Sequence, residues 1–311
     1  MEKLHVSASP HIHSGRSTQR TMLDVIIALI PATIAGTVIF GIRALLVTFV
    51  CVATCVLSEL IFNKIVKKPQ SVSDLSAAVT GLILALNLPV NVPLWEAAVG
   101  SVFAIIIVKC IFGGVGKNIV NPAATARVFM LIAFESITRS ALPRNAVDTV
   151  SSATPLVQLS DGNLADPALL DLFLGNIGGT IGETCKLALL IGGAYLLIRK
   201  VIMWHTPVAY IGTAFVLTLL LEGGDFTRSL SFILSGGLII GAIFMATDYV
   251  TSPATPLGRA IFGIGAGLLT VTIRYWGVYP EGVSFAILIM NILNPYIDSL
   301  TARKLFGGKK K

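Results

Sequence analysis

The stretch Gly81-Leu82-Ile83-Leu84-Ala85-Leu86-Asn87-Leu88-Pro89 decides the fold, because it returns in outline as Gly241-Ala242-Ile243-Phe244-Met245-Ala246-Thr247-Asp248-Tyr249. Each copy is a short apolar segment followed by a Pro-containing turn and another apolar block. An Asn-Pro pair comes later in each half, Asn121-Pro122 and Asn294-Pro295, although at opposite ends of their blocks. The pattern predicts two related halves, each with one short or broken helix. The alternative interpretation is that these glycines and prolines only ease helix packing in lipid.

The composition places the whole chain in a membrane. Its 311 residues are 54% hydrophobic and 13% charged, with a mean hydropathy of +0.84. A soluble globule of this size needs more polar surface, so we expect an integral membrane protein. The first 20 residues are polar and lack the apolar core and cleavage site of a signal peptide. They are expected to form a basic cytoplasmic arm.

About ten apolar blocks are long enough, or nearly so, to cross the hydrocarbon layer. They run about Leu23–Phe40, Ala44–Phe62, Leu75–Leu88, Trp95–Phe112, Pro122–Phe134, Thr184–Ile198, Pro207–Leu221, Leu230–Thr247, Leu257–Trp276 and Val283–Leu300. Five spans per half, an odd number, would place the two copies in inverted orientation. The predicted fold is therefore an all-α integral membrane protein, with two inverted five-helix repeats in a urea-transporter-like arrangement and a short or broken helix in each half.

The predicted organisation has five parts. They are a basic arm (1–22), a first repeat (23–135), an extracytoplasmic loop (136–183), a second repeat (184–300) and a basic tail (301–311). Most Lys and Arg residues fall on one side if both termini are cytoplasmic, and the minor exceptions are Arg139, Arg144, Arg228 and Arg274. Membrane topology explains the net charge of +7 better than nucleic-acid binding does, because the basic residues lie at the ends of apolar blocks.

A polar run, Asp148-Thr149-Val150-Ser151-Ser152-Ala153-Thr154-Pro155-Leu156, lies in the predicted outside loop. Small residues lead to a threonine that the following proline holds extended, which favours an accessible hydroxyl. We interpret Thr154 as a cofactor attachment point.

These residues resemble a known family of membrane flavoproteins, which includes the D subunit of the Rnf complex and the B subunit of the sodium-pumping NADH:quinone oxidoreductase. The similarity covers nearly the whole chain. It is carried by Ser9-Pro10-His11, Ala28-Leu29-Ile30-Pro31-Ala32, Phe112–Ala123 and Asp148–Leu156. The short N-terminal region favours the Rnf protein.

The resemblance implies that a flavin transferase joins FMN, through its phosphate, to the hydroxyl of Thr154. The family motif resembles Asp-x-x-Ser/Thr-Gly/Ser-Ala-Thr, and Asp148, Ser151, Ser152 and Ala153 fill its other places, with Ser152 where glycine is common. The implied function is electron transfer in an ion-translocating ferredoxin:NAD+ oxidoreductase of the bacterial inner membrane, a translocase in which this chain alone has no turnover. The implied partners are the iron–sulfur B and C subunits, the flavin-carrying G subunit and the membrane A and E subunits of the Rnf complex. The coupled ion, Na+ or H+, stays open.

The resemblance also implies a second, non-covalent flavin, riboflavin or FMN, near the cytoplasmic side. It suggests that the Phe112–Ala123 loop and the half-helix after it shape a flavin cavity, with Asn118, Asn121 and Arg127 as candidate binding residues. A tight turn explains the three glycines of this loop, Gly113, Gly114 and Gly116, equally well. Their spacing is not that of a dinucleotide-binding fold.

Other candidates receive less weight. Cys51 and Cys55 lie one helical turn apart, but buried thiols are common in apolar helices, so we assign no metal site. Asp24 and Glu59 are interpreted as solvated or snorkelling carboxylates, whereas Asp248 is the carboxylate to test first for cation handling. Two competing functions remain: a urea-type channel or transporter without redox chemistry, and a scaffold protein with a dispensable flavin. A protein band without flavin fluorescence in a denaturing gel, from a strain with an active flavin transferase, would favour the channel.

Overall fold

The computed structural model describes residues 17–137, 169–175, 177–277 and 281–302. Within these ranges the regular structure is helical and forms no sheet. The first half contains α1 (Thr18–Phe40), α2 (Ile42–Ile65), η1 (Val72–Asp74), α3 (Ser76–Leu86), α4 (Leu94–Val102), η2 (Phe103–Cys110), α5 (Pro122–Ala133) and η3 (Glu135–Ile137). The second half contains α7 (Leu169–Leu174), α8 (Lys186–Ile198), α9 (His205–Leu221), α10 (Phe226–Leu234), α11 (Leu238–Ile240), η4 (Gly241–Met245), α12 (Pro256–Trp276) and α13 (Val283–Thr301).

Local sequence sets the ends of several helices. The Ser17 hydroxyl caps α1 by accepting a hydrogen bond from the Arg20 amide at 3.3 Å. Gly41, with φ 85°, separates α1 from α2, because this backbone conformation is costly for other residues. Two helices, α5 and α12, begin with a polar cap followed by proline, Asn121-Pro122 and Thr255-Pro256. Proline suits the first helical position, where its missing N–H costs no hydrogen bond.

Each predicted apolar block falls on helix, but two blocks are not regular α-helices. The fourth passes from α4 into η2, a π-helical segment. The eighth is broken: α10 and the α11–η4 segment meet at 67° across Ser235–Gly237. The third block is also short, since α3 has 11 residues. The prediction of a short or broken helix in each half is confirmed, by the short α3 in the first half and by the break between α10 and α11 in the second.

Length and apolar composition identify fewer spans than the sequence predicted. Four helices, α1, α2, α12 and α13, are long and apolar enough to cross a membrane, and a fifth span results if the bent pair counts as one. The apolar helices α3, α5, α8 and α9 are shorter than a full crossing. The protein is thus an all-helical, multi-pass membrane protein, and the ten-span arrangement in inverted repeats stays a prediction.

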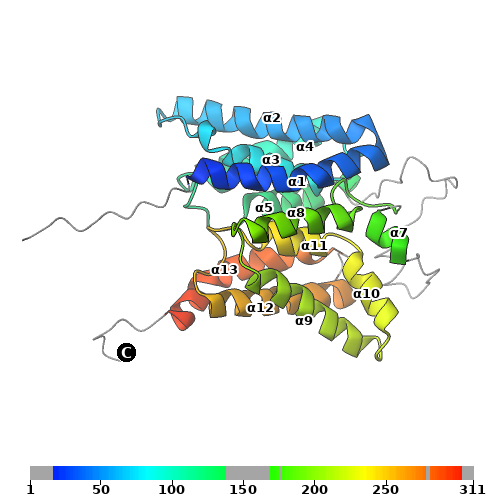
Figure 1. Cartoon of the computed structure of the whole chain (residues 1–311). Helices are drawn as coiled ribbons and strands as arrows, with labels where there is room; N and C mark the ends of the chain where they lie inside the picture. The colour runs from blue at the N-terminus through cyan, green and yellow to red at the C-terminus, as the bar shows by residue number, and fades with distance from the viewer. Residues whose placement is uncertain (1–16, 138–168, 176, 278–280, 303–311) are drawn as a thin grey trace, which may run out of the picture.

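The two halves pack closely against each other. Helix α1 contacts α8, and α5 contacts α13, so helices from opposite halves lie side by side in the middle of the molecule (Figure 1). Within the halves, α2 packs on α3 and α4, and α9 packs on α12. Small residues permit the closest approaches: a Cβ on Gly192 of α8 would lie 2.0 Å from the Ala28 oxygen of α1. This is the packing that small residues provide between helices in lipid.

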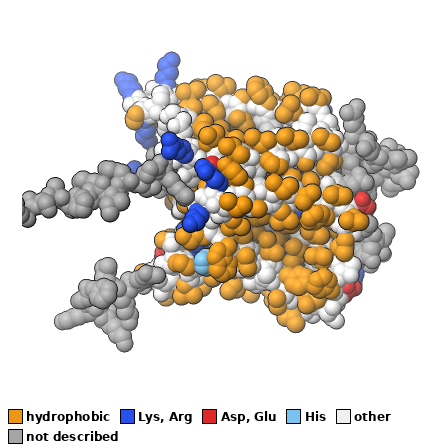
Figure 2. All heavy atoms as spheres, in the orientation of Figure 1, with side chains coloured by type: hydrophobic (Ala, Val, Ile, Leu, Met, Phe, Trp, Pro, Cys, Tyr) orange, Lys and Arg blue, Asp and Glu red, His pale blue; other side chains and the backbone are white. Residues whose placement is uncertain are grey.

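Basic and hydrophobic side chains occupy different parts of the surface. Figure 2 shows Lys and Arg side chains gathered at one end of the molecule, where α1 begins and α13 ends, and hydrophobic side chains over much of the remaining visible surface. Exposed apolar residues include Ile34, Val38 and Phe49 on α1 and α2. Such a surface is suited to contact with lipid or with other membrane proteins, and its basic end to one aqueous side.

Candidate functional site

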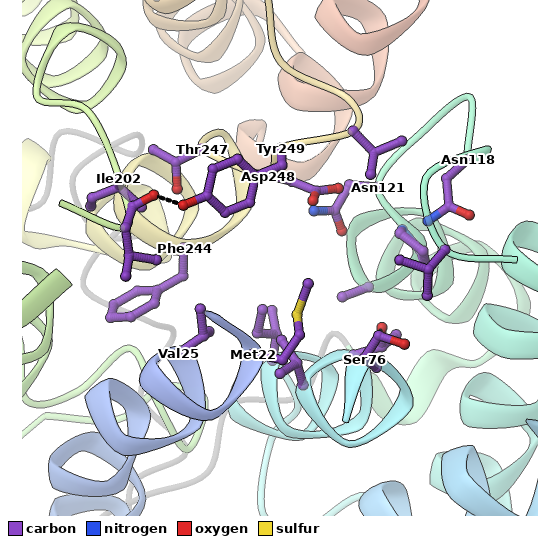
Figure 3. Close-up of a pocket in the computed structure, with 18 of the residues that line it drawn as sticks. Met22, Val25, Ser76, Asn118, Asn121, Ile202, Phe244, Thr247, Asp248 and Tyr249 are labelled. Atoms are coloured by element: carbon purple, nitrogen blue, oxygen red, sulfur yellow. Dashed lines mark hydrogen bonds between the residues drawn. The ribbon is translucent and has the colours of Figure 1, made fainter. Parts of the chain in front are cut away.

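A cavity lies between the two halves, near the basic end (Figure 3). The space between its atoms is about 770 Å³ when the open solvent at its mouth is included, and the part open to a water molecule is about 90 Å³. Its apolar walls come from the start of α1, from α3 and from η4, and include Val25, Val79, Ile83 and Phe244. Its polar groups are Ser76, Thr80, Lys109, Asn118, Asn121, Thr247 and Asp248. Apolar walls with a few converging polar groups are typical of small-molecule sites.

Asn121 joins the two halves at the cavity wall. Its side-chain oxygen caps α5 by accepting from the Ala124 amide at 3.1 Å, and its Nδ2 donates to the Met245 carbonyl at the end of η4 at 3.2 Å. The Asn121 backbone N–H donates to Asn291 Oδ1 of α13 at 3.0 Å. One residue thus fixes α5, η4 and α13 around the cavity.

Asn118 differs from Asn121 in its hydrogen bonding. Its Oδ1 atom is buried and, within the described residues, accepts no hydrogen bond. A buried polar atom without a partner is costly, so this oxygen is available to a donor on a bound molecule. The residue lines the cavity (Figure 3). Both asparagines proposed from the sequence therefore lie at one site.

The loop before Asn118 is a tight turn. Gly113, Gly114 and Gly116 have φ values of 118°, 94° and 85°, which side-chain-bearing residues rarely adopt. Backbone geometry thus accounts for these glycines. The turn also carries Val115 and Asn118 to the cavity, so the two interpretations of the loop are compatible.

A buried ion pair borders the cavity on the α2 side. Lys109 of η2 and Glu59 of α2 are each 1% exposed, and Lys109 Nζ lies 3.0 Å from both carboxylate oxygens of Glu59. The ammonium also donates to Ser76 Oγ at 2.6 Å. The interpretation of Glu59 as a solvated or snorkelling carboxylate is therefore wrong, since helix packing has enclosed it with a partner. Glu59 also accepts a hydrogen bond from Ser71 at 2.6 Å.

Asp248 lies beyond the last helical residue of η4 and lines the cavity (Figure 3). Burial raises the pKa of its carboxyl, and hydrogen bonds from the Thr251 hydroxyl and from the backbone N–H groups of Val250 and Tyr249 oppose the rise. The described residues contain no group of three or more His, Cys, Asp or Glu side chains that could hold a metal. A cation-handling role for Asp248 remains a prediction.

A second charged cluster lies deeper between the halves. Arg127 of α5 is 4% exposed and contacts Glu183, at 3.2 Å, and Glu281. Its guanidinium also donates to the backbone carbonyl of Asn87, the residue after α3. The Asn87 Nδ2 in turn donates to Ile83 O at 2.7 Å and caps the end of α3. Arg127 is not among the cavity-lining residues, so the structure separates it from Asn118 and Asn121.

Two further buried cations donate hydrogen bonds to backbone carbonyls at the break between α10 and α11. Arg274 donates to the carbonyls of Phe232 and Ser235 at 2.8 and 3.0 Å, and Lys186 donates to that of Gly236 at 3.3 Å. Cations at a helix C-terminus are favourable because the carbonyls there carry partial negative charge. Arg274 was an exception to the predicted placement of Lys and Arg on the cytoplasmic side. Its hydrogen bonds to these buried carbonyls explain why it lies in the interior.

The proposed attachment motif lies elsewhere. Asp148, Ser151, Ser152, Ala153 and Thr154 fall outside the described residues. The described sites that sequence reasoning missed are Lys109, Glu183 and Lys186. The sequence contained a signal for Lys109 and Lys186, because a lysine in or beside an apolar block is costly unless its charge is paired. Cys51 and Cys55 are fully buried, and Cys55 Sγ lies 3.8 Å from the Ser101 carbonyl oxygen.

The fold and these sites define a class: a multi-pass helical membrane protein with buried charge pairs and, between two packed halves, a largely apolar cavity that contains a few polar groups. Comparison with known proteins identifies the family. The model of the NQR2, RnfD, RnfE family matches residues 5–307, and the chain belongs to this family.

Named relatives are similar over nearly their full lengths. The chain is 46% identical over 310 residues to the D subunit of the Na(+)-translocating ferredoxin:NAD(+) oxidoreductase complex of Acetobacterium woodii, covering 99% of this chain and 96% of the relative. It is 41% identical to the D subunit of the proton-translocating ferredoxin:NAD(+) oxidoreductase complex of Clostridium ljungdahlii, covering 98% and 96%. It is 38% identical to the D subunit of the ion-translocating oxidoreductase complex of Stutzerimonas stutzeri, covering 94% and 92%. Relatives of similar identity thus carry names with different ions.

Proposed function

We propose that this protein is the D subunit of an Rnf-type, ion-translocating ferredoxin:NAD+ oxidoreductase and carries electrons within it. The observation that carries the proposal is the likeness to proteins of that name along 99% of the chain. The expected partners are the iron–sulfur B and C subunits, the flavin-carrying G subunit and the membrane A and E subunits. Coupling is to Na+ or H+, because the names of the relatives include both ions.

The carrier proposed for this chain is FMN joined through its phosphate to Thr154. A phosphoester keeps a negative charge and needs water or cations nearby, which suits an aqueous loop containing Arg139 and Arg144. A flavin supplies redox chemistry that side chains lack, because it accepts two electrons and releases them singly. Asp148, Ser151, Ser152 and Ala153 would form the sequence that the flavin transferase recognises.

Fluorescence of the denatured protein tests the attachment. The chain is produced in a host with an active flavin transferase, and the gel band is expected to emit yellow-green light. Thr154→Val should give a dark band, whereas Thr149→Val, which removes a neighbouring hydroxyl from the same loop, should stay fluorescent. Mass spectrometry of the loop peptide should show the mass of esterified FMN. An unmodified wild-type peptide would overturn this part of the proposal.

The second flavin, riboflavin or FMN without a covalent bond, is proposed for the cavity between the halves. Two features of the cavity support this proposal: among the described residues Asn118 Oδ1 is a buried acceptor without a partner, and the walls are largely apolar. Asn118 would accept from a ring N–H, and Val79, Ile83 and Phe244 would exclude water from the ring faces. Arg127, outside the cavity, would fix the surrounding helices.

The proposed membrane arrangement is ten spans in two inverted repeats, residues 23–135 and 184–300, in the bacterial inner membrane with both termini cytoplasmic. The contact of α1 with α8, and of α5 with α13, supports it. These are the first and last apolar blocks of each half, and a two-fold relation between halves brings equivalent helices together. The 136–183 loop, with Thr154, would then lie outside.

A further inference from the structure

An apolar groove lies between α8 and α9, separate from the cavity described above. Helix α8 packs on α1 and α9 packs on α12, so these consecutive helices leave a space between them. Both helices are visible in Figure 1, and hydrophobic side chains cover the same part of the surface in Figure 2. Each wall is a stripe with the spacing i, i+3, i+4, i+7, from Leu190 to Leu197 on α8 and from Val208 to Phe215 on α9. Residues at this spacing share one helix face, so the groove runs along both helices.

The groove requires an apolar occupant in a membrane. Its space is about 1140 Å³ when the open solvent is included, and about 590 Å³ is open to a water molecule. All the side chains that line it are apolar, including Ile243 of η4. Water inside a groove of this kind would lack the hydrogen-bond partners that it needs. An apolar molecule, by contrast, would gain van der Waals contacts with both walls and with η4.

The length of the groove favours a lipid acyl chain over a protein helix. Each stripe covers seven residue steps, which is roughly 10 Å of helix. One leaflet of the hydrocarbon layer is about 15 Å deep, half of its full thickness of about 30 Å. The groove thus has the length of most of one leaflet. A partner helix that crosses the membrane would extend well beyond it.

The mouth of the groove lies at the basic end of the molecule. The turn from α8 to α9 carries Lys200, which is exposed, and Arg199, which pairs with Asp24 of α1. Helix α9 begins at His205 without a side-chain cap, and a helix N-terminus carries partial positive charge. Trp204, beside this N-terminus, is 58% exposed, as is typical of aromatic residues at the head-group level. These charges are complementary to an anionic head group.

We propose that the groove binds one acyl chain of an anionic phospholipid from the leaflet at the basic end, with the lipid phosphate near Lys200 and the start of α9. The occupied groove fills the space that packing leaves between α8 and α9. The lipid site does not depend on either flavin. It adds a structural ligand to the electron-carrying role proposed above.

Native mass spectrometry of the full-length protein tests the acyl-chain site. The protein is purified in detergent, mixed with phosphatidylglycerol and freed of detergent in the instrument, and the lipids that stay bound are counted. We expect the wild type to keep one phosphatidylglycerol. Gly212→Phe should lose it, because a Cβ there would meet nothing within 4 Å and the ring would occupy the groove. Val216→Phe, the matched control, adds a ring at an exposed position of α9 outside the groove and should keep the lipid.

The same measurement with phosphatidylcholine of equal acyl chains tests the head-group site. The wild type should prefer phosphatidylglycerol, and Lys200→Asn should reduce this preference by about fivefold, the effect of one basic residue near a lipid surface. Asparagine suits the left-handed backbone of this position, where φ is 54°. Lys67→Asn is the matched control, because Lys67 is also exposed and has φ 57°, but lies in the α2–η1 turn. It should leave the preference unchanged.

Three results would overturn the proposal. One is equal lipid retention in Gly212→Phe and Val216→Phe, and another is equal binding of the two lipids by the wild type. The third is a crosslink, in the purified complex, from Gly212→Cys to another subunit through a short bifunctional reagent, because a protein helix would then occupy the groove. If Gly212→Phe does not fold, Ala194→Phe fills the groove from α8 and takes its place in the comparison.

Discussion

At the residue scale, the buried pair of Lys109 and Glu59 makes a stability prediction that needs no cofactor. Lys109→Met should lower the free energy of unfolding by about 3–5 kcal/mol, because it leaves the Glu59 carboxylate enclosed without a partner. The double variant Lys109→Met/Glu59→Met should recover much of this loss, since it removes both charges and keeps similar volume. Thermal unfolding of the purified protein in detergent measures both. A double variant no more stable than the single one would contradict the prediction.

A second residue-scale prediction concerns Asn118. Asn118→Leu should remove the non-covalent flavin, measured by acid extraction of the purified protein. The change replaces the unpartnered acceptor of the cavity with an apolar group of similar size. Fluorescence of the denatured band should be unchanged, since Thr154 is not altered. Asn63→Leu is the matched control: Asn63 is also buried but bonds Ser71 rather than lining the cavity. Loss of flavin from both variants would point to general destabilisation.

The sequence predicted two residues of the cavity wall, but it did not predict which buried charges pair with each other. Asn118 and Asn121 were selected through the resemblance, and both line the cavity. The pairing of Lys109 with Glu59 joins positions 50 residues apart and depends on how α2 and η2 pack. Such a contact has no local signal beyond the high cost of a lone charge among apolar residues. Arg127 shows the same limit, because its partners come from three separate loops.

At the element scale, the approach of α1 to α8 depends on Gly192. A Cβ there would lie 2.0 Å from the Ala28 carbonyl oxygen, so Gly192→Ala must push the two helices apart. We expect a loss of about 1–3 kcal/mol, typical of an overpacked interface. Gly212 of α9 is the control, because its Cβ would meet nothing within 4 Å. Gly212→Ala should leave the melting temperature unchanged or raise it, since alanine favours helix over glycine by about 0.5–1 kcal/mol.

Helix positions were predictable because apolar runs bounded by polar caps leave few alternatives in a membrane. The kind of helix was not. The apolar pattern contained no signal for the π-helical turns of η2 and η4. At the 67° break before α11, two buried cations from elsewhere in the chain donate to backbone carbonyls at the end of α10. A sequence window around the break contains neither Lys186 nor Arg274, so local reasoning misses the reason for its stability.

At the scale of the whole molecule, the number of spans separates two topologies. Ten spans place five crossings, α3, α4–η2, α5, α8 and α9, between Lys67 and Thr227, so these two residues lie on opposite sides of the membrane. If only the four long helices cross, no crossing lies between them and they share a side. Both residues are exposed, at the α2–η1 turn and in the first turn of α10. Their accessibility therefore reports on topology rather than on burial.

Cysteine labelling in a background without Cys51, Cys55, Cys110 and Cys185 makes the measurement. With a membrane-impermeant maleimide, Lys67→Cys should react only in inverted vesicles, because its basic surroundings are expected to be cytoplasmic. Thr227→Cys should react only in intact spheroplasts. Flavin fluorescence of each variant verifies that the protein is folded and modified. Labelling of both positions from the same side would refute the inverted five-helix repeats, and it would also remove the reason for placing the Thr154 loop outside, since that placement follows from the same odd count of crossings.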